Sequence, residues 1–68
     1  MLKYKIDVLS ALHESGYTTY RIRKEKLLAE ASLQAIREDR VVGINALAQL
    51  CDLLDLQPGD IIEYRKEE

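Results

Sequence analysis

Residues 18–40 constrain the fold of this 68-residue chain most, because they hold two helix-forming stretches with no glycine or proline between them. Thr18 is a good N-cap for the first stretch, since its hydroxyl can accept a hydrogen bond from a free amide of the first turn. We therefore predict a helix from about residue 19 to residue 26, followed by a second amphipathic segment.

The junction, Leu-Leu-Ala-Glu-Ala at 27–31, leaves the backbone direction open. All five residues are good helix formers, so propensity alone would extend one helix from Thr19 to about Arg37. Against this, the adjacent Leu27 and Leu28 spread the apolar side chains over a broad arc of a straight helix. A bend near residues 26–29 would fold both halves around the same core. From the residues alone, one continuous helix and two helices joined by a bend are almost equally favoured.

The N-terminal segment predicts another helix. Apolar residues between about residues 4 and 15 fall on one helical stripe, and Gly16 suits the left-handed position that commonly ends a helix. Charged and apolar residues alternate over residues 2–6. A short strand at the start of the chain is therefore the alternative for those residues.

The C-terminal third predicts a loop over residues 38–43 and a strongly amphipathic helix over residues 44–56. Pro58 suits the first position of a final short helix, and Asp60 is favoured near its positive end. Residues 65–68 are expected to fray.

Composition excludes most enzymes and ligand-binding proteins. The chain is 47% hydrophobic, which is ample for one compact domain over residues 1–68. Cys51 and His13 are each the single residue of their type, and the three glycines are isolated. We therefore expect no catalytic site, metal, cofactor or small-molecule ligand. No apolar run or signal peptide indicates a membrane protein, so a cytoplasmic location is expected.

Charge is unevenly distributed although the net charge is only −2. Residues 17–40 carry six cations against four carboxylates, whereas residues 41–68 carry two cations against six carboxylates. Cations thus gather where a phosphate backbone would need them. The plainer interpretation of the same charges is a solvated helix face.

The pattern from Leu47 to Tyr64, with its Gln-Pro-Gly-Asp turn, and the segment Gly16-Tyr-Thr-Thr19 resemble Cro/repressor-type (XRE-like) helix-turn-helix domains. The resemblance covers almost the whole chain. It implies an all-α fold, a compact bundle of five short helices like that of lambda repressor, and it favours the bend at residues 26–29.

The resemblance also implies a recognition helix over residues 30–37 that enters the major groove of double-stranded DNA. The base-contacting residues that it implies are Glu30, Ala31, Ser32 and Gln34. The phosphate-contacting residues that it implies are Thr19, Tyr20, Arg23, Lys24 and Arg40. By their chemistry, Gln34 suits an adenine edge, Glu30 a cytosine amino group and Ala31 a thymine methyl.

Four residues depart from the family pattern, and one of them is Glu30, which brings a negative charge towards the DNA. Leu27 stands where such domains often have a glycine, and Arg23 stands where a small residue is usual. Ala29 cannot cap the recognition helix through its side chain, which costs about 1 kcal/mol relative to Ser or Thr.

We therefore predict a sequence-specific transcriptional regulator, a repressor that binds DNA as a homodimer. Ile61, Ile62 and Tyr64 are candidates for the dimer surface, and the alternative is that they complete the core. The alternative is a non-catalytic protein-interaction module of the same fold, such as an antitoxin-like or antirepressor subunit. A long-helix hairpin with a structural role would follow from an unbent backbone.

Overall fold

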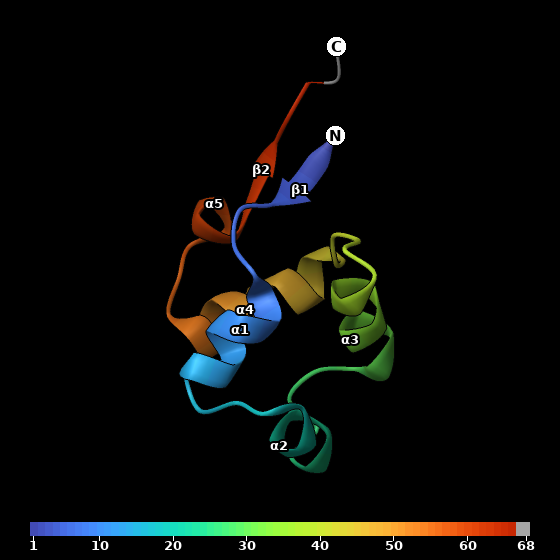
Figure 1. The fold of residues 1–68 in the computed structure, drawn as a ribbon, viewed down its shortest axis with the longest axis vertical. Helices are drawn as coiled ribbons and strands as arrows, with labels where there is room; N and C mark the ends of the chain where they lie inside the picture. Colours follow the sequence, from blue (N-terminus) through green and yellow to red (C-terminus); the bar gives the residue numbers. More distant parts are fainter. Residues whose placement is uncertain (67–68) are drawn as a thin grey trace.

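The computed structural model describes residues 1–66 of the chain, and these residues form helices and one small sheet. In chain order the elements are β1 (Leu2–Tyr4), α1 (Val8–Glu14), α2 (Thr19–Lys24), α3 (Glu30–Arg37), α4 (Ile44–Leu54), α5 (Pro58–Ile61) and β2 (Ile62–Tyr64). Figure 1 shows the helices gathered into one cluster, with the two strands projecting from one end and α2 at the opposite end. The prediction of five short helices is confirmed.

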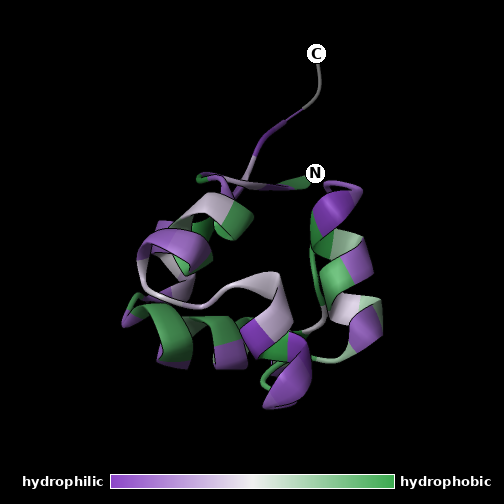
Figure 2. Cartoon of the chain, turned by 60° about the horizontal axis from the view of Figure 1, so that its bottom comes forward, coloured by the Kyte–Doolittle hydropathy of each residue, from purple (hydrophilic) through white to green (hydrophobic). Residues whose placement is uncertain are grey.

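One hydrophobic core joins all the helices. The buried side chains are Val8, Leu12, Ile22, Leu28, Leu33, Ala35, Ile36, Val42, Ala46, Leu50 and Ile61. Figure 2 shows hydrophobic and hydrophilic residues alternating along the helix ribbons, as expected of helices with one buried face. Each helix is short, so its stability comes mainly from burying this face rather than from intrinsic propensity.

Helix α1 begins later than the sequence pattern predicted. Asp7 is its N-cap, and the Asp7 carboxylate accepts a hydrogen bond from the backbone N–H of Ser10 at 3.1 Å. The prediction that this helix begins near Tyr4 is therefore wrong, and the alternative of a short initial strand is confirmed. Gly16, at φ +90°, takes the left-handed position after α1, as predicted.

The backbone bends between α2 and α3, and the bend is made by Lys26. Its φ of 53° lies in the left-handed region. The N–H of Lys26 donates to the carbonyl of Arg23 (3.3 Å), and the N–H of Leu27 donates to the carbonyl of Ile22 (3.0 Å). This pair of bonds is a Schellman motif, the arrangement in which many helices end. The left-handed residue is thus Lys26, one position before the Leu27 that the family pattern indicated.

Burial explains why a segment of good helix formers bends. Leu28 is buried and Leu27 is half-buried, and both pack with the core that α1, α3 and α4 share. The bend brings the two adjacent leucines to one core, which offsets the strain of a non-glycine residue in the left-handed region. The single-rod interpretation, and with it the long-helix hairpin, is wrong.

The fold is not strictly all-α, because β1 and β2 form a two-stranded antiparallel sheet. The register pairs Leu2 with Tyr64, Lys3 with Glu63 and Tyr4 with Ile62. The sequence pattern indicated only β1 as an alternative. The pairing continues into the expected frayed tail, since the N–H of Arg65 donates to the carbonyl of Met1 at 2.8 Å. Residues 67–68 lie outside the described residues.

Candidate nucleic-acid interface

Helix α3 presents one exposed face because its other face is anchored in the core. Leu33 is fully buried, and Ala35 and Ile36 are buried beside it. Of the four predicted base-contacting residues, Glu30, Ala31 and Gln34 are exposed and Ser32 is half-buried. Because α3 turns by about 100° per residue, the three exposed residues lie along the same side of the helix.

The N-terminus of α3 carries an ion pair that crosses the bend. The Nε of Arg23 in α2 lies 2.7 Å from the Oε1 of Glu30, and its Nη2 lies 3.4 Å from Oε2. Ala29 is the N-cap and, as expected, makes no side-chain capping bond. Arg23 and Glu30 were predicted to contact a phosphate and a base respectively, and in the free protein they contact each other.

The C-terminal end of α3 holds a second group of polar contacts. The Nε2 of Gln34 donates to the Oε2 of Glu38 at 2.6 Å. The Nη2 of Arg40, in the loop after α3, lies 3.1 Å from the Oε1 of Glu38. Glu38 therefore joins a predicted base contact to a predicted phosphate contact, and Glu38 itself was not among the predicted site residues.

Arg40 is fixed at its backbone by a side chain from β1. The hydroxyl of Tyr4 donates to the carbonyl of Arg40 (2.7 Å) and accepts from the N–H of Val42 (3.1 Å). The N–H of Arg40 also donates to the carbonyl of Ala35 at 2.8 Å. Burial raises the pKa of the Tyr4 hydroxyl, so the hydroxyl is neutral and can donate at physiological pH. The sheet thus holds in place the loop that carries Arg40.

The remaining predicted phosphate contacts lie on α2. Thr19, the first residue of α2, is half-buried, and the side chain of Tyr20 is 72% exposed. The Nζ of Lys24 lies 5.7 Å from the centre of the Tyr20 ring, within the range of a cation–π contact. The N-cap is Thr18, as predicted, with its Oγ1 accepting from the N–H of Arg21 at 3.2 Å.

The predicted cationic segment is partly neutralised within the protein. Arg21 pairs with Glu25, Arg23 with Glu30, and Arg40 with Glu38. All three pairs are exposed, and exposed pairs of this kind contribute only about 0–1 kcal/mol. A phosphate group can therefore replace each carboxylate at little cost.

Two further cations, Lys26 and Arg37, lie near these residues; both belong to the predicted cationic segment, but neither was assigned a DNA contact. Both are exposed, and neither makes an ion pair with another of residues 1–66. Arg37 is one helical turn beyond Gln34, and this spacing was the signal that could have identified it. Lys26 could not be identified, because its exposure depends on the bend.

A depression of about 520 Å³ lies at the bend itself. It is lined by Arg23, Lys26, Leu28, Ala29, Glu30 and Gln49. Because it combines two basic side chains with the N-cap and the first residue of α3, this depression adjoins the exposed sides of α2 and α3.

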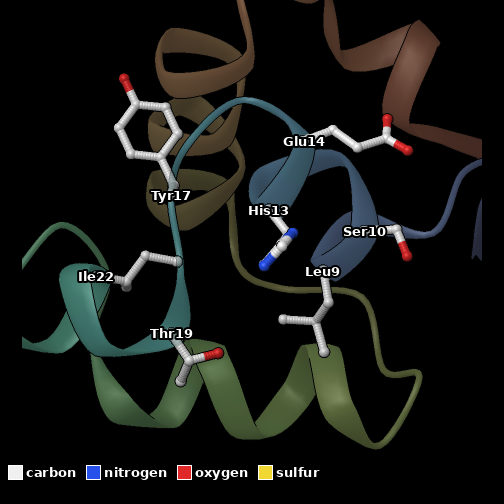
Figure 3. Close-up of a pocket in the computed structure, with 7 residues that line it drawn as sticks. All are labelled: Leu9, Ser10, His13, Glu14, Tyr17, Thr19 and Ile22. Carbon is white, nitrogen blue, oxygen red and sulfur yellow. The ribbon is translucent and has the colours of Figure 1, made fainter.

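A separate depression of about 330 Å³ lies between α1 and the start of α2. It is lined by Leu9, Ser10, His13, Glu14, Tyr17, Thr19 and Ile22. Figure 3 shows the His13 imidazole pointing into it, whereas Glu14 and the Tyr17 hydroxyl point away.

Within residues 1–66, no three His, Cys, Asp or Glu side chains are grouped closely enough to hold a metal ion. Among the same residues, no helix is long and apolar enough to cross a membrane.

Comparison with known proteins agrees with this geometry. Residues 5–67 match the family described as the Cro/C1-type HTH DNA-binding domain. The uncharacterized HTH-type transcriptional regulator YozG of Bacillus subtilis (strain 168) is 32% identical over 63 residues, which cover 93% of this chain and 75% of that protein. No solved structure matches the chain. The chain belongs to the Cro/C1-type helix-turn-helix family and is a DNA-binding transcription regulator.

Proposed function

We propose that this protein binds specific DNA sequences by inserting α3 into the major groove and represses transcription at those sites. The observation that carries the proposal is the left-handed turn at Lys26. That turn ends α2 and lets α3 leave in a new direction, with Glu30, Ala31 and Gln34 exposed on one side. A helix with a free polar side and a width of about 10–12 Å fits the major groove.

Base recognition follows from the side chains on that exposed face. Gln34 supplies one donor and one acceptor to an adenine edge, and Glu30 accepts from a cytosine amino group. The methyl group of Ala31 packs against a thymine methyl. Ser32, which is half-buried, contributes least, because only part of its side chain reaches the surface.

Phosphate contacts come from both sides of α3. Thr19, Tyr20, Arg23 and Lys24 lie on α2, and Arg40 lies in the loop that Tyr4 holds. Arg23 and Arg40 exchange their carboxylate partners for phosphate oxygens on binding. These contacts fix the position of α3 on the duplex and add affinity that is independent of sequence.

One copy of α3 spans only a few base pairs, so useful specificity requires a homodimer on two half-sites about 34–36 Å apart. Of the three candidates for the dimer surface, Ile61 is fully buried and Ile62 is half-buried, and both pack in the core. Tyr64 is 66% exposed beside its strand partner Leu2, which is 53% exposed. These two apolar side chains lie on a sheet with two open strand edges, which supports a dimer through this sheet. A dimer covering the DNA represses by excluding other proteins from it.

Selection of genomic DNA fragments by the purified protein, followed by a salt titration on the selected duplex, tests the proposal. We expect one enriched sequence with two related half-sites. The affinity should fall steeply with salt, since each phosphate contact contributes about −0.9 to the slope of log K against log salt. A flat salt dependence, or no enrichment, would contradict the proposal.

The second candidate is a protein-interaction module of the same fold. It is favoured by the three paired arginines of residues 17–40 and by the net charge of −2, which reduce the electrostatic attraction to DNA. The same titration separates the two candidates, because a module that binds only proteins has no measurable affinity for any duplex at low salt.

A further inference from the structure

Glu38 occupies a position that the stability of α3 does not favour. It is the C-cap residue of the helix, and helix C-termini carry partial negative charge that destabilises a nearby carboxylate. Its side chain is about half exposed, so it does not fill the core. The side chain of Glu38 instead contacts two residues that were predicted to contact DNA, Gln34 and Arg40.

The two oxygens of the Glu38 carboxylate have different partners. Oε2 accepts a hydrogen bond from the Nε2 of Gln34 at 2.6 Å. Oε1 lies 3.1 Å from the Nη2 of Arg40. The hydrogen bond from Gln34 and the charge of Arg40 both lower the pKa of Glu38, so the carboxylate is ionised at neutral pH.

The contact with Glu38 determines which way the Gln34 amide faces. An ionised carboxylate only accepts hydrogen bonds, so the NH₂ group of Gln34, not its carbonyl, must face Glu38. Gln34 keeps one N–H and its carbonyl oxygen for other partners. An adenine edge requires one donor and one acceptor, so the Gln34 amide is held in one orientation and still has both groups available.

The contact with Arg40 lowers the affinity of the protein for DNA. The backbone of Arg40 is fixed by Tyr4 and Ala35, so its side chain remains within reach of Glu38. A carboxylate beside this guanidinium offsets its attraction to phosphates on any DNA, whatever the sequence.

We propose that Glu38 is a positioning residue that increases sequence discrimination, by orienting the Gln34 amide, and reduces affinity for unrelated DNA, by pairing with Arg40. This inference rests on the proposed function, since it requires that Gln34 contact a base. Loss of the carboxylate should therefore weaken discrimination and strengthen binding to random DNA at the same time.

The test compares Glu38→Ala with a matched control, Asp39→Asn. Asp39 is adjacent and exposed and makes no side-chain hydrogen bond with another of residues 1–66. Its φ of 60° lies in the left-handed region, which asparagine tolerates. Both variants remove one negative charge from the same place, but only Glu38→Ala removes the contacts with Gln34 and Arg40.

Fluorescence anisotropy would measure the dissociation constants for three duplexes. These are the duplex selected by the wild-type protein, the same duplex changed at the base pair where Gln34→Ala loses discrimination, and a random duplex. Glu38→Ala should lower discrimination at that base pair by about fivefold or more, the lower end of what one bidentate contact provides. Its affinity for the random duplex should rise at least as much as that of Asp39→Asn.

Two further variants separate positioning from a general change in fold. The double variant Gln34→Ala/Glu38→Ala should lose no more sequence discrimination than the single variant Gln34→Ala. Glu38→Gln, which still offers an accepting oxygen to Gln34, should keep most of the discrimination while binding random DNA more tightly. Thermal melting followed by circular dichroism checks that each variant is folded.

Equal discrimination by Glu38→Ala and Asp39→Asn, or additive losses in the double variant, would overturn the inference and leave the proposed function standing. If Gln34→Ala has no effect on discrimination at any base pair, or no duplex binds at low salt, the proposed function fails and the inference fails with it.

Discussion

Arg23 and Glu30 face each other across the bend between α2 and α3, with the Nε of Arg23 2.7 Å from the Oε1 of Glu30. The two residues are seven positions apart, a spacing that would not bring them together on one straight helix, where neighbours are three or four residues apart. The pair therefore exists because the backbone bends. It also places a carboxylate directly beside one of the cations that were predicted to bind phosphate.

Glu30→Gln is predicted to strengthen binding to random duplexes several-fold, because Arg23 is then free for a phosphate group. The salt slope should become steeper by about one phosphate contact, or about 0.9. Anisotropy titrations at several salt concentrations measure both quantities. Glu14→Gln is the control, since Glu14 is exposed on α1 and its removal changes only the net charge. An equal effect of the two variants would show that the ion pair does not restrain Arg23.

Gln34→Ala and Arg40→Ala are predicted to affect different parts of DNA binding. Loss of Gln34 removes a base contact and should lower the preference for the selected duplex by about 1–3 kcal/mol, while random DNA binds as before. Loss of Arg40 removes a phosphate contact and should weaken binding to both duplexes about equally. Equal losses on selected and random duplexes for Gln34→Ala would argue against α3 as the recognition helix.

Lys26→Gly is predicted to leave the protein as stable or up to about 1 kcal/mol more stable, because glycine has no Cβ to strain the left-handed backbone. Lys24→Gly is the matched control. Lys24 is the last residue of α2, and glycine there should cost about 0.5–1 kcal/mol. Urea denaturation gives the free energy of unfolding of each variant. A clear loss of stability in Lys26→Gly would mean that this lysine stabilises the turn through its side chain.

Tyr4→Phe is predicted to cost about 1–2 kcal/mol of unfolding free energy at neutral pH, because the N–H of Val42 and the carbonyl of Arg40 both lose a partner. It should also reduce affinity for all duplexes, since the loop that carries Arg40 loses its attachment to β1. Differential scanning calorimetry and anisotropy measure the two effects. The tyrosine substitution Tyr17→Phe, in the segment between α1 and α2, should change neither the stability nor the affinity by a comparable amount.

The pH dependence of stability gives a further test of the same contact. Burial is the main cause of the raised pKa of Tyr4, with the charge of Asp39 raising it further and the Val42 hydrogen bond opposing them. A group whose pKa is raised by folding stabilises the protein below its unfolded value, here 10.0, and loses that contribution as pH rises through the folded pKa. Wild-type stability should therefore fall more steeply than that of Tyr4→Phe as pH rises above about 10. Parallel curves for the two proteins would mean that folding does not raise the pKa of the Tyr4 hydroxyl.

Local signals in the sequence were sufficient for several features of the fold. The cap at Thr18, the left-handed Gly16 and the final helix at Pro58 each depend on a residue and its immediate neighbours, and each was predicted correctly. The uncapped start of α3 at Ala29 was expected only from the family resemblance, because local propensity did not show that a helix begins at residue 30.

Features that depend on distant residues could not be predicted in the same way. The left-handed backbone of Lys26 follows from burying Leu28 in a shared core, whereas local propensity favoured a continuous helix. The strand β2 is only three residues long and forms because β1 lies beside it, at the other end of the chain. The pairing of Glu38 with Arg40 depends on a loop that Tyr4 holds from β1, so no local pattern indicated it.

Intermolecular nuclear Overhauser effects on a complex with the selected duplex show whether α3 lies in the major groove. We expect contacts from the Ala31 methyl group and the Gln34 side chain to major-groove protons, such as thymine methyl and cytosine H5 protons. Contacts from these residues to sugar protons only, or contacts to the bases from another surface while α3 shows none, would contradict this placement in the major groove.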